Sequence, residues 1–215
     1  MELPIRDRTE AGHALGDALA AYAGRDDVIV LALPRGGVPV GYEVAEAIGA
    51  DLDLMLVRKL GTPGQLELAM GAIASGGTRV LNQEIIDGLS IGEATLEDVA
   101  QREQQELERR QRAYRGDRPL PELRAQCVIL VDDGIATGAT MRAAIAALRQ
   151  QAPARIVVAV PVAPPDTVAR LRREADEVVC LETPAPFVAI GRWYQDFPQL
   201  SDADVRDLLS RAWNR

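Results

Sequence analysis

Two adjacent carboxylates and a run of small residues follow an apolar stretch in VILVDDGIATGAT, residues 128–140. Asp132 and Asp133 come directly after the apolar residues, and GIATGAT follows them. Small side chains let backbone amides close on a phosphate, and the start of a helix adds a partial positive charge. Because carboxylates repel phosphate, the aspartates should face neutral hydroxyls or a metal ion instead. A phosphorylated sugar satisfies both halves of the motif.

Two other phosphate-binding motifs do not match this stretch. A nucleoside-triphosphate P-loop needs a lysine before its Ser or Thr, and the stretch contains no lysine. A dinucleotide fingerprint needs G-x-G-x-x-G after a strand, which is also absent. An ordinary turn between a strand and a helix is the remaining alternative, although such a turn seldom needs two adjacent acids.

Apolar runs and their punctuation predict the elements that position this motif. Continuous apolar runs are typical of strands buried on both faces, and they occur at residues 28–33, 52–57, 127–131, 155–162 and 177–182. Helical patterns alternate with them, at residues 8–23, 38–49, 95–115, 140–151 and 165–174. This alternation predicts an α/β fold, a mostly parallel sheet with helices on both faces. We expect a single domain over residues 1–215, with its core at about 25–182.

Three segments between the strands carry other patterns. Residues 60–70 are punctuated by glycine and proline and predict a loop, whereas residues 71–82 predict a β-hairpin. Residues 95–115 are strongly charged, with Thr95 and Asp98 spaced like a helix cap. The apolar positions in this last segment are few, which predicts a mostly solvated helix.

Composition excludes several classes of function. The net charge of −8 argues against nonspecific binding to nucleic acid, which needs a cationic surface. No apolar run approaches the roughly 20 residues of a membrane span, and the first ten residues lack the pattern of a secretory signal. Cys127 and Cys180 form no cluster with metal-ligand spacing, so we expect two reduced thiols in a cytoplasmic protein.

Lys59 is the only lysine among 24 basic residues. A chain that otherwise uses arginine keeps a lysine where a compact ammonium is needed rather than a planar guanidinium. We therefore treat Lys59 as a candidate site residue, with chance as the alternative.

The stretch VILVDDGIATGATM resembles the binding signature for 5-phosphoribosyl 1-pyrophosphate (PRPP) in type I phosphoribosyltransferases. The chain is also similar to bacterial stand-alone phosphoribosyltransferases whose acceptor substrate is generally unassigned. The resemblance covers roughly residues 25–200. It implies a flexible loop or hairpin, an inserted charged helix and a C-terminal hood formed by residues 183–200 with the N-terminal segment.

The resemblance implies a PRPP site with three parts. Asp132 and Asp133 would hold the ribose hydroxyls. The 5′-phosphate would bind to Ala136, Thr137, Gly138, Ala139 and Thr140. The sequence PRGG, residues 34–37, resembles the pyrophosphate loop of the family, which often contains a cis non-proline peptide. There Arg35 could pair with a phosphate oxygen, while Gly36 and Gly37 expose amides to an anion.

Residues after the second strand would carry the catalytic groups. Arg58 and Lys59, placed at the end of that strand, resemble the basic pair that orotate-type members use near pyrophosphate. Residues 60–76 would be the mobile catalytic hood, whose closure excludes water from a reactive sugar cation. Glu67 is the only carboxylate in it. Adenine-type members place a loop glutamate against the base, so Glu67 is a candidate general acid or base, with a solvent-facing glutamate as the alternative.

The implied reaction is displacement of pyrophosphate at the anomeric carbon of ribose by a ring nitrogen. Mg²⁺ would bridge the pyrophosphate and the ribose hydroxyls, so it is the expected cofactor. We predict no direct cluster of metal-binding side chains, because PRPP itself would hold most of the ion, with Asp132 and Asp133 as the candidate protein ligands. Family members are commonly dimers, and we expect a homodimer.

Two resemblances conflict on the acceptor. Hypoxanthine-guanine enzymes have an aspartate at the position of Ala136, and DDGIATGAT is closer to the adenine-type pattern DDLLATGGT. The segment 183–197 nevertheless resembles the hood of 6-oxopurine enzymes, in which an aromatic after a proline stacks on the base. Phe187 would be that aromatic, with Trp193 or Tyr194 nearby, unless the segment only closes the edge of the sheet. We expect a nucleobase-like heterocycle and leave its identity open.

Two other roles compete with catalysis. A non-catalytic PRPP-binding regulator would carry a DNA-binding segment and usually lose the basic residues on the pyrophosphate side. Only about 27 residues precede the first strand, and Arg35, Arg58 and Lys59 are present, which favours an enzyme. A third possibility is a subunit that binds PRPP weakly and uses residues 95–115 as its contact.

Overall fold

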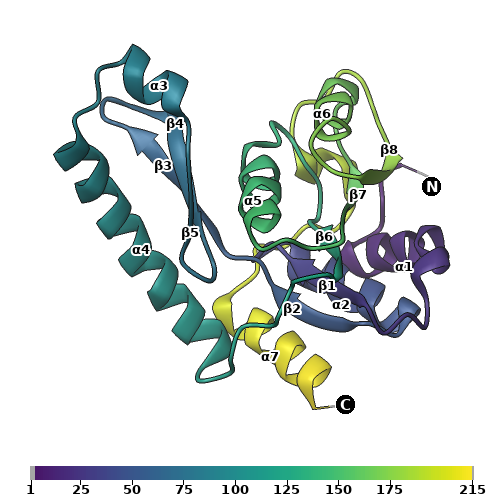
Figure 1. The fold of residues 1–215 in the computed structure, drawn as a ribbon. Helices are drawn as coiled ribbons and strands as arrows, with labels where there is room; N and C mark the ends of the chain where they lie inside the picture. Colours follow the sequence, from purple (N-terminus) through teal and green to yellow (C-terminus); the bar gives the residue numbers. More distant parts are fainter. Residues whose placement is uncertain (1–2, 215) are drawn as a thin grey trace.

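A five-stranded parallel sheet forms the main body of the protein (Figure 1). The structure, a computed structural model, describes residues 3–214, except for the side chains of residues 66 and 67. The strand order is β2-β1-β6-β7-β8. The strands are β1 (Val28–Ala32), β2 (Asp51–Leu54), β6 (Cys127–Val131), β7 (Arg155–Val162) and β8 (Glu177–Glu182). The predicted α/β fold with a parallel sheet is confirmed.

Helices cover both faces of this sheet (Figure 1). They are α1 (Arg8–Ala18), α2 (Gly37–Ile48), α5 (Ala139–Gln150), α6 (Pro165–Leu171) and α7 (Asp202–Trp213), with two short 3₁₀ helices, Ala20–Tyr22 and Ile190–Trp193. Alternate residues of β1 fill the two cores. Val30 packs in the core that contains α1, α2 and α7, whereas Leu31 packs in the core that contains α5 and α6. A strand that is covered on both faces of the sheet must be apolar at every position. This is why β1 appears in the sequence as an uninterrupted apolar run.

A separate antiparallel sheet holds β3 (Val57–Thr62), β4 (Gln65–Ala74) and β5 (Thr78–Leu81). The hairpin predicted in residues 71–82 is confirmed, since β4 and β5 pair around the turn at 75–77. The loop predicted at 60–70 is wrong, because β3 pairs with β4 and buries Leu60 and Met70. Gly64, with φ of +80°, makes the tight turn between these two strands, and this punctuation hid the strands on either side of it.

The division into two sheets also corrects the predicted second strand. β2 ends at Leu54, and residues 57–62 belong to the antiparallel sheet rather than to a continuation of β2. Arg58 and Lys59 therefore lie near the start of β3 and not at the end of the second strand.

The charged segment forms one long helix, α4 (Glu93–Arg115), after the short α3 (Gln83–Gly88). Gly92 is the N-cap of α4, so the predicted cap at Thr95 is wrong. Most of the helix is exposed or half-buried, as predicted, and its few apolar residues share one face. That face packs against β3, β4 and α7, and its buried apolar residues are Leu96, Ala100, Leu107 and Tyr114.

The C-terminal helix α7 was not predicted. It begins with a capping box, in which the Ser201 hydroxyl accepts from the Asp204 amide at 3.2 Å and Asp204 Oδ2 accepts from the Ser201 amide at 2.7 Å. Near its other end, Trp213 Nε1 donates to the Leu52 carbonyl of β2 at 2.8 Å. Across residues 3–214, no helix combines the length and the apolarity needed to cross a bilayer.

Candidate active site

The end of β6 carries both predicted acids and the start of a small-residue cradle. The Asp133 amide donates to Asp132 Oδ1 at 2.9 Å. Residues 134–138 then turn into α5, with Gly138 as its N-cap at φ of +77°. A cavity of about 150 Å³ lies at this turn. It is lined by Asp132, Gly134, Ile135, Ala136, Thr137, Gly138, Ala139, Thr140, Met141 and Ile190. The structure thus brings the five residues proposed for the 5′-phosphate around one cavity at a helix N-terminus.

Thr167 of α6 holds this turn in place. Its hydroxyl donates to the Ala136 carbonyl at 2.9 Å. A Cβ atom at Gly138 would lie 2.9 Å from the Thr167 methyl group, so only glycine allows this approach as well as the positive φ. Nothing in the local sequence pattern pointed to Thr167, which lies 31 positions from its partner.

The PRGG loop lies directly against the two aspartates. The Pro34–Arg35 peptide is cis, as in the pyrophosphate loops that this sequence resembles. A Cβ atom at Gly36 would lie only 2.1 Å from Asp133 Oδ2, and one at Gly37 would lie 2.6 Å from the Val131 carbonyl. Both glycines are therefore needed for the loop to reach the end of β6.

A buried arginine from α1 completes this cluster. Arg8 Nε donates to Asp133 Oδ2 at 2.9 Å, and Arg8 Nη1 donates to the Pro198 carbonyl at 2.9 Å. The same guanidinium lies 3.9 Å from the centre of the Phe197 ring. The sequence offered no signal for Arg8, because its partner lies 125 positions away.

The surroundings of the two carboxyls favour their neutral forms. Burial, followed by the charge of Asp133, raises the pKa of Asp132 well above its usual value. Burial also raises the pKa of Asp133, and the charge of Arg8 opposes that rise. Tyr194 donates its hydroxyl proton to the Asp133 carbonyl at 2.6 Å, and burial raises the pKa of this phenol. A bound cation or a set of hydroxyl donors would therefore favour the ionised aspartates.

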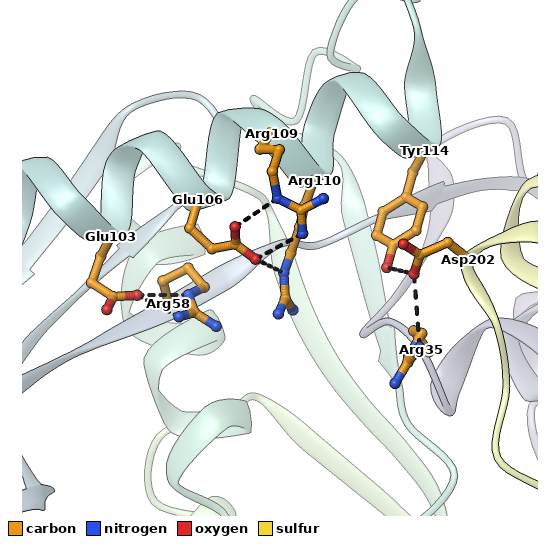
Figure 2. Close-up of polar contacts among 8 residues, drawn as sticks. All are labelled: Arg35, Arg58, Glu103, Glu106, Arg109, Arg110, Tyr114 and Asp202. Carbon is orange, nitrogen blue, oxygen red and sulfur yellow. Dashed lines mark hydrogen bonds and ion pairs between the residues drawn. The ribbon is translucent and has the colours of Figure 1, made fainter.

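Arg35 and Arg58 each face a carboxylate from another element (Figure 2). Arg35 Nη1 lies 3.8 Å from Asp202 Oδ1, at the start of α7. Arg58 Nε donates to Glu103 Oε2 of α4 at 2.7 Å. The two guanidiniums are thus paired with acids that are not part of the PRPP-like motif.

The other two predicted catalytic residues have different settings. Lys59 lines a cavity of about 230 Å³ between the antiparallel sheet and α5, together with Ala139 and Arg142. It is therefore near the start of α5 but not in the cavity at the Asp132 turn. Glu67 lies in β4, and its side chain is outside the described part of the chain. Its role as a general acid or base stays a prediction.

The aromatic residues of the C-terminal segment form two groups. Phe187 and Trp193 face each other, with ring centres 5.9 Å apart. A cavity of about 410 Å³ beside Asp133 is lined instead by Phe197. The other lining residues are Arg8, Arg35, Gly36, Asp133, Ile190, Pro198, Gln199 and Leu200. The resemblance to 6-oxopurine enzymes predicted Phe187 and Trp193 at the acceptor. Neither of them lines the cavity beside Asp133, whose aromatic residue is Phe197.

The donor set fits a magnesium ion that is held mainly by its substrate. Among residues 3–214, no cluster of three or more His, Cys, Asp or Glu side chains could hold a metal. Mg²⁺ commonly binds through one or two carboxylates together with substrate phosphates and waters. Because Arg8 occupies one oxygen of Asp133, Asp132 is the better placed of the two acids to contribute.

Comparisons with known proteins show the family of this chain. A family model described as a phosphoribosyl transferase domain matches residues 9–194, and the chain belongs to this family. A protein named "Putative phosphoribosyl transferase" in two strains of Mycobacterium tuberculosis is 47% identical over 206 residues, which are 96% of this chain and 46% of that protein. The chain therefore spans about half the length of these curated relatives. The crystal structure of TT1426 from Thermus thermophilus is 45% identical, with a TM-score of 0.88, and the match covers 96% of this chain and 98% of that one.

Proposed function

We propose that this protein transfers the 5-phosphoribosyl group of PRPP to a nitrogen of a nucleobase-like acceptor, with Mg²⁺ as the cofactor and pyrophosphate as the second product. The observation that carries the proposal is the contact between Gly36 and Asp133. A Cβ atom would not fit between them, so the PRGG loop and the two acids form one continuous site. The cradle at residues 136–140 opens from the same strand end.

Each part of PRPP has a chemically matched group. The cradle offers backbone amides, the Thr137 and Thr140 hydroxyls and the N-terminus of α5 to the 5′-phosphate. Asp132 accepts hydrogen bonds from ribose hydroxyls. Arg35 faces the pyrophosphate, and charge-assisted bonds from a guanidinium suit its oxygens.

The chemistry needs positioning more than covalent participation. The acceptor nitrogen attacks the anomeric carbon as the bond to the pyrophosphate oxygen breaks, so the ribose passes through a cationic, oxocarbenium-like transition state. Asp132 is the candidate protein ligand for a Mg²⁺ ion held mainly by PRPP, and such an ion would supply positive charge to the leaving pyrophosphate. Asp132 places a negative charge near the developing cation, while Arg35 and Arg58 stabilise the departing oxygens. Glu67 is the candidate acceptor of the proton that the attacking nitrogen loses.

The cavity beside Asp133 is our candidate for the acceptor site. Its volume of about 410 Å³ suits a small heterocycle. Ile190 lines both this cavity and the phosphate cradle, so an acceptor here would lie next to the ribose. In this arrangement Phe197, rather than Phe187 and Trp193, supplies the aromatic surface. The two assignments are separated by comparing Phe197→Ala with Phe187→Ala, because the larger rise in acceptor KM identifies the residue at the acceptor.

The test combines binding and turnover. PRPP binding is measured by titration calorimetry with Mg²⁺, and pyrophosphate release is followed across a panel of purines, pyrimidines and small nitrogen heterocycles. Binding with release supports the enzyme, whereas binding without release with any acceptor supports the regulator. Asp132→Asn should weaken PRPP binding, and unchanged affinity would contradict the ribose role. The homodimer and the cytoplasmic location stay predictions.

A further inference from the structure

We propose that α4 supplies a third guanidinium, that of Arg110, to the pyrophosphate end of the site. This inference rests on the proposed function and adds a binding residue to it. The PRPP-like motif contains no part of α4, and the sequence pattern gave this helix no role in the site.

The location of Arg110 carries the inference. Arg110 and Arg58 line one narrow cleft together with Pro34 of the PRGG loop and Thr140 of the cradle. The remaining lining residues are Leu33, Met55, Leu56, Val57 and Leu107. Four separate elements therefore meet here, and two of their side chains are guanidiniums. Such a pair matches the charge of a pyrophosphate group better than that of a single phosphate.

The neighbouring Arg109 shows that this placement is specific. Both arginines pair with Glu106, since Arg109 Nε and Arg110 Nε donate to its two oxygens at 2.7 Å each. The side chain of Arg109 is 61% exposed, whereas that of Arg110 is 37% exposed. In Figure 2, Arg110 extends away from α4 between Arg58 and Arg35, while the guanidinium of Arg109 stays closer to the helix.

Three acids pair with guanidiniums in this part of the protein, and one of them, Glu106, is shared by Arg109 and Arg110. Glu103 pairs with Arg58, Glu106 pairs with Arg110, and Asp202 lies near Arg35. The cleft holds only about 30 Å³, which is space for a water-sized group. A pyrophosphate group must therefore draw the guanidiniums away from their glutamates. The glutamates act as counter-ions that the substrate replaces.

The surroundings of Tyr114 indicate that the guanidiniums of Arg110 and Arg35 lie in the same part of the protein. Its hydroxyl donates to Asp202 Oδ1 at 2.8 Å. Burial and the contact with Asp202 raise the pKa of Tyr114, and the positive charges of Arg110 and Arg35 partly offset that rise. Both guanidiniums thus act on the same phenol, although they come from different elements.

The experiment measures binding of inorganic pyrophosphate, ribose 5-phosphate and PRPP to the full chain in the presence of Mg²⁺. Arg110→Ala should weaken pyrophosphate and PRPP binding by about tenfold, the loss expected for one charge-assisted contact. Binding of ribose 5-phosphate should stay unchanged, because that ligand has no pyrophosphate group. Arg109→Ala is the matched control, and it should leave all three affinities within about twofold.

A second variant tests the counter-ion role of Glu106, and here pyrophosphate binding should become tighter rather than weaker. Glu106→Gln should tighten pyrophosphate binding, because it removes a carboxylate that competes for Arg110. The same substitution in the Arg110→Ala background should have no effect. Unchanged pyrophosphate binding in folded Arg110→Ala, with normal PRPP binding by the parent chain, would overturn this inference alone. A parent chain that binds neither PRPP nor pyrophosphate would overturn the proposed function as well.

Discussion

Arg8 and Asp133 form a buried ion pair, with Arg8 Nε 2.9 Å from Asp133 Oδ2, and this pair joins the N-terminal helix to the site acids. Removing one partner of a buried pair leaves an uncompensated charge. We expect Arg8→Met to lower the free energy of unfolding by roughly 3 kcal/mol at neutral pH, measured by urea denaturation.

The pH dependence of this loss has a definite sign. Without Arg8, the pKa of Asp133 should rise further, so the variant's stability should fall as pH rises through that pKa. The difference in the free energy of unfolding between Arg8→Met and the parent should therefore be smallest at acidic pH. Arg6→Met, at an arginine that is 63% exposed, is the control and should cost less than about 0.5 kcal/mol. Equal losses for the two variants would show that the pair is not important for stability.

Gly36 should tolerate no side chain. We expect Gly36→Ala to reduce PRPP affinity at least tenfold, since its Cβ would lie 2.1 Å from Asp133 Oδ2 and must push the loop or the acid away. PRPP titration checks this. Gly88→Ala is the control, because no atom lies within 4 Å of a Cβ at that position and its φ is not positive. Normal affinity in Gly36→Ala would contradict the proposed continuity of loop and acids.

The carboxyl group of Asp132 should lower the stability of the fold at neutral pH, although the proposed function needs it for PRPP binding. Its raised pKa means that the folded chain holds this proton more tightly than the unfolded chain. The stability that the neutral acid contributes is present below the ordinary carboxyl pKa and is lost as pH rises through the raised value. Asp132→Asn removes the charge but keeps the shape, so it should raise the free energy of unfolding at neutral pH by about 1 kcal/mol.

Thermal unfolding, measured from the ordinary carboxyl pKa of about 4 upwards, should show a flatter pH profile for Asp132→Asn than for the parent. Asp117→Asn, at an exposed position, should leave the parent profile unchanged. A destabilised Asp132→Asn would indicate that the folded chain depends on the ionised carboxylate in a way that an amide cannot replace.

A substitution at Leu107 tests how much the packing of α4 contributes to the stability of the fold. It is 1% exposed, whereas Leu89 is 50% exposed. We expect Leu107→Ala to cost about 3 kcal/mol by chemical denaturation, and Leu89→Ala to cost less than about 0.5 kcal/mol. A small loss at Leu107 would contradict the packing of this helix face against the rest of the protein.

The parallel sheet and the motif at the end of β6 could be predicted because their signals are local. A strand buried on both faces must be apolar, and Asp132 and Asp133 follow one directly. The antiparallel sheet was missed in part, since glycine and proline at its turn resemble a loop from the sequence. Arg8, Thr167, Phe197 and Arg110 could not be predicted, because each reaches the site only through contacts with distant segments.

The contact between Trp213 and β2 has a consequence for association. β2 is one of the two edge strands of the parallel sheet, the other being β8, and the neighbouring Met55 amide donates to the Ala32 carbonyl of β1. Backbone groups of successive residues in a strand point to opposite sides. Because the Met55 amide points toward β1, the backbone groups of Leu52 and Leu54 point away from it. Trp213 occupies the Leu52 carbonyl, and the Asp53 carboxylate occupies the Leu54 amide at 2.6 Å. The β2 edge therefore offers few open groups to a strand of another chain, which disfavours edge-to-edge pairing on this side of the sheet.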